Sequence, residues 1–259
     1  MNKSIDYNKC VGCLKCVRDC VVNHLLVCDD TQDVRYNKPV FVDKGRCIEC
    51  GHCEAICPNQ AVITDNCSDF DESDGLLRQM SLKRTVRDYI KNSTIEKKIL
   101  DNIILAGQSA PTDRNRKTCR IILIKEKLGE VYNLAVDWLV SEVEKTGTIN
   151  PLYKSTIAMA ANRDTVLWNA EYLVAIVGNT EYVVDAAITA ERMQLEADCY
   201  GIGTGYRGDI KKAINNNGCI REIIGIKPRE EVLVTFAMGM TNCKYYRSNI
   251  KQNRKVVYL

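Results

Sequence analysis

The sequence predicts two domains, of which the larger, C-terminal one has a layered α+β or α/β fold. Eight of the 14 cysteines lie in two compact motifs before residue 58. An acidic stretch with few apolar residues follows at 65–75, as in a surface connector. From residue 76 onward, helical and strand periodicities alternate, which indicates a layered domain. A chain of 259 residues suffices for one full core and a smaller unit.

Composition and charge exclude several classes of protein. The chain is 46% hydrophobic and 27% charged, as in ordinary globular proteins. It has no run of 18 apolar residues and does not start with the apolar region of a signal peptide, so we expect neither membrane association nor export. A net charge of +3 does not favour nucleic-acid binding, and two histidines do not favour a histidine-built metal site. With 14 cysteines, these features predict a reducing, cytoplasmic location.

The two cysteine motifs have the spacing of iron–sulfur ligands. They are Cys10-x2-Cys13-x2-Cys16-x3-Cys20 and Cys47-x2-Cys50-x2-Cys53-x3-Cys57-Pro58. A four-iron cube needs four thiolates; one loop supplies three, and the last cysteine of the opposite motif supplies the fourth. The expected ligand sets are Cys10, Cys13, Cys16 and Cys57 for one cluster, and Cys47, Cys50, Cys53 and Cys20 for the other. Zinc sites and disulfides also use closely spaced cysteines, but this double pattern favours them much less.

Residues 1–67 resemble a bacterial two-[4Fe–4S] ferredoxin. The first motif departs from that pattern because Val21, rather than a proline, follows it. The connection at 21–46 is long, and we expect it to form a hairpin of 34–36 with 39–42. Six single cysteines outside the motifs are expected to be buried packing residues. They are Cys28, Cys67, Cys119, Cys199, Cys219 and Cys243.

The second domain is expected at residues 79–259, after a linker at 68–78. Apolar side chains at helical spacing or in continuous short runs define its elements. The predicted helices are residues 94–107, 130–145 and 180–200, and the glycines at 201–203 end the last one. The predicted strands are residues 120–124, taken as buried, 172–178, 231–239 and, at the C-terminus, 256–259.

Three short segments of this domain carry candidate binding residues. Residues 83–87 place three cations and a hydroxyl within five positions, which suits a phosphate and a polar chain or, alternatively, a solvated loop. Residues 109–116 alone indicate only a turn. Residues 201–208 hold four glycines, which suits close approach to a flat ligand or a flexible loop after the helix. Their spacing is not G-x-G-x-x-G, so a Rossmann site is disfavoured.

In this order, the three segments resemble the nitroreductase family of FMN flavoproteins. The family's opening R-x-S-x-R-x-F pattern is approximated by residues 84–89, its A-P-S-x-x-N turn by 110–115 and its G-L-G-T-x-W-x-G loop by 201–208. A later strand that contains a glycine corresponds to 238–240. The resemblance covers residues 76–259. It implies an α+β fold, with an FMN-dependent nitroreductase-type domain after the two-cluster ferredoxin-like domain.

The resemblance also implies binding residues by position. The candidate contacts to the phosphate, ribityl chain and N1/O2 edge of FMN are Lys83, Arg84, Thr85 and Arg87. The candidate contacts to the FMN of a partner subunit are Pro111, Thr112 and Asn115, because the family builds its site at a homodimer interface. The backbone N–H of Gly208 would lie near flavin N5. By family position, Lys251 and Arg254 are candidate phosphate contacts; the alternative is that this basic tail is only solvated.

Two departures from the family concern the surroundings of the flavin. The family often continues its turn with Gln-Pro-Trp, where this chain has Lys117 and the two residues after it. The tryptophan of the glycine loop is Tyr206 here, followed by Arg207. We expect Lys117 or Arg207, if near N1/O2, to favour reduced, anionic flavin by charge attraction. A preference for nitroaromatic substrates is not implied.

The two halves together predict an electron converter that resembles ferredoxin-fused nitroreductases of anaerobic bacteria. Single electrons would pass through the clusters to FMN, which would reduce a small nitro, quinone or enone acceptor by hydride or electron transfer. The electrons would come from reduced ferredoxin or from NAD(P)H. No catalytic side chain is expected, because the cofactor carries the chemistry. The alternatives are a non-enzymatic electron carrier between proteins and a redox sensor.

Overall fold

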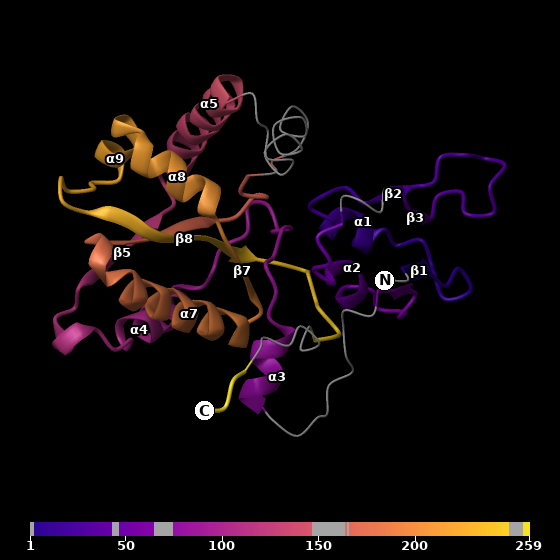
Figure 1. Ribbon diagram of the computed structural model, residues 1–259, viewed down its shortest axis with the longest axis horizontal. Coiled ribbons are helices and arrows are strands. Elements are labelled where there is room, and N and C mark those ends of the chain that lie inside the picture. Colours follow the sequence, from indigo (N-terminus) through magenta and orange to yellow (C-terminus); the bar gives the residue numbers. More distant parts are fainter. Residues whose placement is uncertain (1–2, 43–46, 65–74, 147–163, 165, 249–255) are drawn as a thin grey trace. The chain divides into compact units, whose positions relative to one another are not determined.

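The computed structural model describes residues 3–42, 47–64, 75–146, 164, 166–248 and 256–259 (Figure 1). Contacts divide the chain into two compact units, Met1–Arg84 together with Cys243–Leu259, and Thr85–Asn242. This division differs from the predicted boundaries. Helix α3 (Gly75–Leu82) starts within the predicted linker and belongs to the first unit, and so does the C-terminal segment, which returns to it.

Besides α3, the described part of the first unit contains two short antiparallel strand pairs and two shorter helices. Strand β1 (Ser4–Ile5) pairs with β4 (Val62–Ile63), and β2 (Leu25–Val27) pairs with β3 (Pro39–Phe41). Helix α1 (Lys15–Asp19) lies within the first cysteine motif and α2 (His52–Ala55) within the second.

The predicted hairpin is correct for its second strand and wrong for its first. Strand β3 pairs with Leu25–Val27, whereas residues 34–36 form a turn. Burial explains the difference, because the Leu25 side chain is 1% exposed in the core of this unit and Val34 is 95% exposed. The sequence pattern of residues 34–36 does not show that they lack a packing partner. Of the two segments, only Leu25–Val27 places a side chain, that of Leu25, in the hydrophobic core of this unit.

The second unit is built on a four-stranded sheet with the order β5-β6-β8-β7, in which every neighbouring pair is antiparallel. Its strands are β5 (Cys119–Ile124), β6 (Tyr172–Gly178), β7 (Ile202–Tyr206) and β8 (Glu231–Met240). The strands predicted at 120–124, 172–178 and 231–239 are therefore confirmed. Of the two predicted fold classes, α+β and α/β, the antiparallel sheet identifies α+β. Strand β6 is buried throughout, but β5 is mostly half-buried because it lies at the sheet edge.

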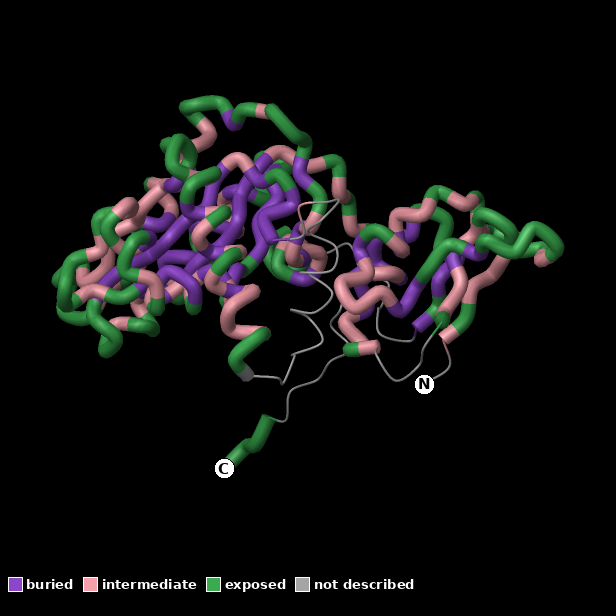
Figure 2. The backbone as a smooth tube through the Cα atoms, turned by 90° about the horizontal axis from the view of Figure 1, so that it is seen from above, coloured by how far each residue is buried: buried purple, intermediate pink, exposed green. Residues whose placement is uncertain are grey.

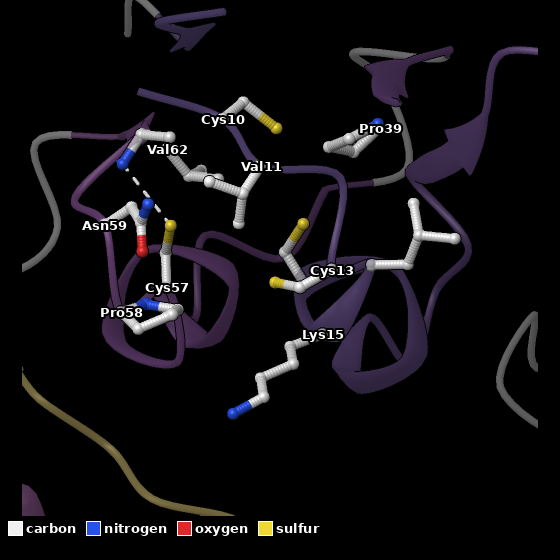
Figure 3. Close-up of a pocket in the computed structure, with 12 residues that line it drawn as sticks. Cys10, Val11, Cys13, Lys15, Pro39, Cys57, Pro58, Asn59 and Val62 are labelled. Carbon is white, nitrogen blue, oxygen red and sulfur yellow. Dashed lines mark hydrogen bonds between the residues drawn. The ribbon is translucent and has the colours of Figure 1, made fainter. Parts of the chain in front are cut away.

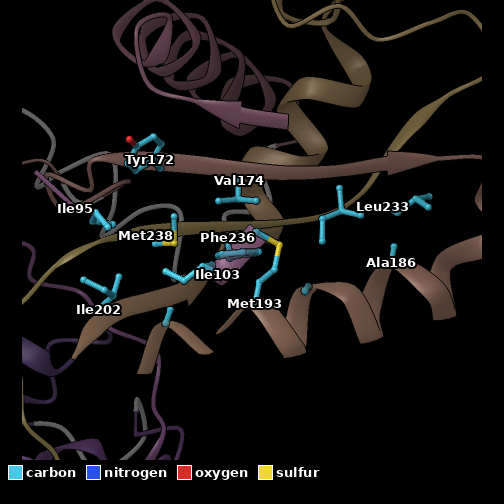
Figure 4. Close-up of a cluster of buried hydrophobic side chains, with 13 residues drawn as sticks. Ile95, Ile103, Tyr172, Val174, Ala186, Met193, Ile202, Leu233, Phe236 and Met238 are labelled. Atoms are coloured by element: carbon cyan, nitrogen blue, oxygen red, sulfur yellow. The ribbon is translucent and has the colours of Figure 1, made fainter. Parts of the chain in front are cut away.

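Helices cover both faces of this sheet (Figure 1). The helices α4 (Lys97–Gln108) and α7 (Val183–Cys199) pack together on one face, and α5 (Leu128–Thr146), α8 (Gly208–Asn216) and α9 (Gly218–Ile223) lie on the other. The three predicted helices are thus confirmed, with a short 3-10 turn, Thr180–Tyr182, before α7. Buried residues concentrate between these layers (Figure 2). Ile103, Met193 and Phe236 are fully buried there, between sheet and helices (Figure 4).

Two predictions about the second half are wrong. The glycine-rich segment is not a loop, since Ile202–Tyr206 is strand β7, paired with β8. Helix α7 ends at Cys199, and Gly201, just after its C-cap Tyr200, has a φ of +67° that suits a glycine. Residues 256–259 are exposed and form no strand, because none of the strands that the structure describes pairs with their backbone.

The single cysteines differ in burial. Cys28 is buried as expected, Cys119 and Cys243 are half-buried, and Cys199 and Cys219 are exposed, against expectation. Cys67 lies outside the described residues. No helix in the described parts of the chain combines the length and the apolar character that crossing a membrane requires.

Candidate functional site

The first predicted ligand set lies together. Cys10, Cys13, Cys16 and Cys57 line one pocket. Figure 3 shows labelled members of the set turned toward a shared space, with the side-chain amine of Lys15 directed away from it. Three of these cysteines come from the first motif and one from the second, as expected from the spacing.

The second predicted set lies together as well. Cys20, Cys47, Cys50 and Cys53 line another pocket. His24 and His52 also border it. No disulfide joins any of these eight cysteines. Each pocket thus offers four soft sulfur donors around a space, which is the donor set that a four-iron cluster needs.

The backbone gives both motifs the same loop. In the first motif, φ is +71° at Gly12 and +58° at Leu14; at the equivalent places of the second, it is +55° at Glu49 and +67° at Gly51. The left-handed conformation costs a residue other than glycine about 1–2 kcal/mol. Because each loop carries one such residue, the surrounding contacts hold both loops in a shape that turns three thiols to one side.

Backbone N–H groups point at several of the sulfurs. Cys20 Sγ accepts from the N–H of His24 at 3.2 Å, Cys47 Sγ from Glu49 at 3.4 Å and Cys57 Sγ from Ala61 at 3.3 Å. Such hydrogen bonds stabilise charge on sulfur and tune cluster potentials.

The thiols also interact electrostatically within each set. Burial, followed by the charges of Cys57, Cys13 and Cys10, raises the pKa of Cys16 to about 12. Burial, followed chiefly by the charges of Cys50 and Cys20, raises the pKa of Cys53 well above its usual value. Four thiolates crowded in this way need positive charge among them, which the iron of a cluster would supply.

Two candidate FMN residues belong to the cysteine-rich unit. The backbone N–H of Lys83 donates to Gln79 at the end of α3. Arg84 is 6% exposed, and its Nη1 donates to the carbonyl oxygen of Cys50 at 2.8 Å. The structure therefore places the Arg84 guanidinium at the second cysteine motif.

Other FMN candidates lie along strand β7. The segment that contains Thr85 and Arg87, both half-buried, runs beside the strand, and Val86 N–H donates to Thr204 O at 2.9 Å. A Cβ on Gly205 would lie 2.9 Å from Thr85 Cγ2, so glycine allows the close approach. Gly208 begins α8, and open space surrounds the position of its missing Cβ. The glycine-rich segment thus brings backbone close to two of the predicted contacts.

The third group lies at the opposite edge of the sheet. Thr112 and Asn115 line a pocket of about 590 Å³ together with Lys117, beside α4 and β5. This volume falls in the usual range for small-molecule sites, about 300–1,000 Å³. Pro111 is exposed and precedes this turn.

Sequence reasoning missed the residue that holds this turn. The carboxylate of Asp185, in the first turn of α7, accepts from the Asp113 N–H at 3.0 Å and from Thr118 Oγ1 at 2.6 Å. These hydrogen bonds, led by that from Thr118, lower the pKa of Asp185. An acidic residue in the first turn of a predicted helix was the available signal, but its partner is distant in sequence.

The two cations that depart from the family lie in different surroundings. Lys117 is exposed, whereas Arg207 is 6% exposed and lies over the Trp168 ring, 3.8 Å from its centroid. Burial lowers the pKa of Arg207 from its ordinary value. Asp164 fixes the turn before Trp168 by accepting from three backbone N–H groups. Neither Asp164 nor Trp168 was singled out from the sequence.

Of the remaining positions singled out from the sequence, the structure describes Tyr206 but not the two residues of the C-terminal tail. The Tyr206 hydroxyl donates to Glu191 Oε2 at 3.1 Å, and burial, followed by the charge of Glu191, raises the pKa of Tyr206 to about 12. The candidate phosphate contacts Lys251 and Arg254 lie outside the described residues.

Comparisons with known proteins agree with this division. Residues 82–240 match the model of the nitroreductase family, and residues 9–61 match that of a 4Fe-4S dicluster domain. No curated protein matches the chain closely enough to count as a relative.

Several solved structures share the fold. A nitroreductase with bound FMN from Desulfitobacterium hafniense DCB-2 is 18% identical, with a TM-score of 0.57, over 70% of this chain and 98% of that one. A nitroreductase with bound FMN from Bacteroides fragilis NCTC 9343 is 16% identical, with a TM-score of 0.55, over 72% and 96%. An FMN-dependent nitroreductase from Clostridium difficile R20291 is 14% identical, with a TM-score of 0.55, over 72% and 98%. Since the family model spans more than half of the chain, this protein belongs to the nitroreductase family and carries an N-terminal 4Fe-4S dicluster domain.

Proposed function

We propose that this protein is an oxidoreductase that uses FMN and two [4Fe–4S] clusters to reduce a small organic acceptor of the nitro, quinone or enone type. The observation that carries the proposal is the placement of eight cysteines in two four-thiol pockets, each with three members from one motif and one from the other. The same chain carries a nitroreductase-family domain. The neighbours with bound FMN support the choice of flavin.

The clusters and the flavin supply complementary chemistry when bound, because a cluster carries one electron and FMN collects two. Each two-electron reduction of the acceptor takes up two electrons and two protons. Reduced ferredoxin supplies electrons alone, so both protons come from solvent, whereas NAD(P)H supplies a hydride and solvent only one proton. Covalent linkage of the two domains replaces a diffusional encounter with a high effective concentration. Oxygen-labile clusters and many thiols suit a reducing cytoplasm.

In this proposal, the chain binds and orients the flavin. Thr85 and Arg87 would hold its polar edge, with Lys83 as a further candidate, and the Gly208 N–H would lie near N5. Pro111, Thr112 and Asn115 approach the flavin of a partner subunit in a homodimer. The Nη1 of Arg84 is already used at Cys50, so we assign this residue to the iron–sulfur side. The two phosphate candidates of the C-terminal tail complete the proposed set.

Anaerobic purification with metal and flavin analysis tests the cofactors. About eight irons and one FMN per chain are expected from two four-iron clusters and one flavin site. Cys53→Ser removes a proposed ligand and should roughly halve the iron content, whereas Cys219→Ser, which changes an exposed single cysteine, should leave it unchanged. Two zinc ions and no flavin would overturn the proposal.

Turnover assays test the activity. Reduced ferredoxin or NADPH is supplied anaerobically, and re-oxidation of the bound flavin is followed with a nitroaromatic, a quinone and an enone. The proposal expects at least one acceptor to re-oxidise the flavin faster than buffer does. If none does, the protein is an electron carrier or a redox sensor instead.

A further inference from the structure

The two cysteine motifs are equivalent in backbone but not in their charged neighbours. Cys13 and Cys50 occupy the same place in each motif, and the carbonyl oxygen of each accepts from an arginine. Arg18 Nη2 donates to Cys13 O at 3.2 Å from an exposed side chain, whereas Arg84 Nη1 donates to Cys50 O at 2.8 Å and is 6% exposed. Water screens the first cation much more than the second.

A second buried arginine reaches the same motif from the C-terminal segment. Arg247 is 7% exposed, and its Nη1 donates to the carbonyl oxygen of Glu54, the residue after Cys53. The Tyr246 N–H donates to Ala55 O at 2.8 Å and holds the segment there. The second motif therefore has two buried guanidinium groups on its backbone.

The acidic groups near this motif offset part of that charge. Glu49 pairs with Lys3 at 4.0 Å. The buried carboxylate of Glu54 accepts from the backbone N–H and hydroxyl of Thr64. Asp19, before Cys20, accepts from the Tyr245 hydroxyl at 3.3 Å. Because both arginines are held on carbonyls of the loop itself, their charge acts directly on whatever the loop binds.

We propose that Arg84 and Arg247 raise the reduction potential of the cluster held by Cys20, Cys47, Cys50 and Cys53, and do so selectively over the other cluster. The inference rests on the proposed function. Reduction adds one electron to a cluster and makes or breaks no bond, so a nearby buried cation stabilises the reduced form by Coulomb attraction. The chain thereby biases one of two similar clusters toward accepting the electron. The first motif has only an exposed arginine on the equivalent carbonyl.

Redox titration followed by electron paramagnetic resonance tests this on the full chain, purified anaerobically. Arg84→Gln keeps a hydrogen-bond donor but removes the charge. We expect the ratio of oxidised to reduced form of one cluster to rise at least tenfold at a given potential. For a one-electron couple, this lowers the reduction potential by about 59 mV. Arg84→Lys should restore most of the potential. Arg18→Gln is the matched control on the first motif. It should change the ratio of oxidised to reduced form of either cluster by less than threefold.

Further variants keep the result interpretable. Cys47→Ser should alter the same paramagnetic resonance signal that Arg84→Gln shifts. That signal then belongs to the cluster held by Cys20, Cys47, Cys50 and Cys53. Arg247→Gln should shift that signal in the same direction, and it serves as the test if Arg84→Gln loses iron. Equal shifts of both clusters, or no shift with iron retained, would overturn the inference alone. Absence of any cluster signal in the unaltered protein would instead overturn the proposed function.

Discussion

Replacement of Gly205 by alanine should destabilise the second unit, because this glycine lies where two chain segments meet. On one side, β7 pairs with β8, with Gly205 opposite the fully buried Ala237. On the other side, an added Cβ would lie 2.9 Å from Thr85 Cγ2 and 3.0 Å from the carbonyl oxygen of Val86, whereas ordinary contact begins near 3.4 Å. The backbone of Val86 cannot move away freely, because the Val86 N–H donates a hydrogen bond to Thr204 O.

The expected magnitude follows from two opposing effects. Overpacking of this kind costs about 1–3 kcal/mol. Alanine recovers about 0.5–1 kcal/mol in a strand, because it loses less backbone freedom on folding than glycine does. The net loss is about 0–2.5 kcal/mol, which should lower the midpoint of thermal unfolding by up to about 10 °C in a unit of this size. Thr85 is a proposed flavin contact, so retention of FMN should fall as well.

Tryptophan fluorescence follows this unit separately, because both tryptophans, Trp138 and Trp168, lie within it. The matched control is Gly129→Ala in helix α5, where an added Cβ meets nothing within 4 Å. That change should stabilise by less than about 1 kcal/mol through helix propensity, because Gly129 lies in the first turn of α5. If Gly205→Ala unfolds at or above the temperature of the unaltered protein, the close approach of the two segments is not tightly packed and the reasoning fails.

Three further predictions concern stability and are measured by urea unfolding. Phe236→Ala empties a fully buried position in the central core and should cost about 3–5 kcal/mol; a cost below 1 kcal/mol would contradict the core assignment. Asn217 accepts from two backbone N–H groups at the start of α9, so Asn217→Ala should cost about 1 kcal/mol and Asn217→Ser much less. Hydrogen bonds from Arg120 lower the pKa of Glu230 from 4.5 to about 2, so its contribution to stability is present above pH 4.5 and is lost as pH falls toward 2. Glu230→Gln should therefore flatten the pH dependence in that window, and an unchanged slope would exclude this pair as its source.

The cysteine sets could be predicted from the sequence because ligand spacing is a local property. A loop of three cysteines with two residues between them can present three thiols to one side whatever surrounds it. The pockets lined by Cys10 with its partners and Cys20 with its partners follow that prediction. Long helices and central strands were equally clear, because a stripe or run of apolar residues specifies them within one segment.

The errors fall where the deciding neighbour is far away in sequence. The glycine-rich segment looks like a loop by composition, but its glycines permit packing against Thr85 and Val86, so that it forms strand β7. Strand β2 was missed because burial of Leu25, rather than its local pattern, selects it. Composition shows what a segment tolerates, and only its neighbours determine which conformation it adopts.

By itself, the sequence determined the two-domain organisation, the grouping of eight cysteines into two sets of four and the nitroreductase-like order of motifs, since each is encoded in short-range spacing. Tertiary structure alone decided that Arg84 lies on the Cys50 carbonyl and that the C-terminal segment returns to place Arg247 beside Glu54. It also decided that Arg207 is buried against Trp168. An arginine side chain is long and charged, and its guanidinium can lie either in water or buried against a hydrogen-bond acceptor or an aromatic ring. Its partner is therefore fixed by which distant carbonyl or ring the fold brings within reach.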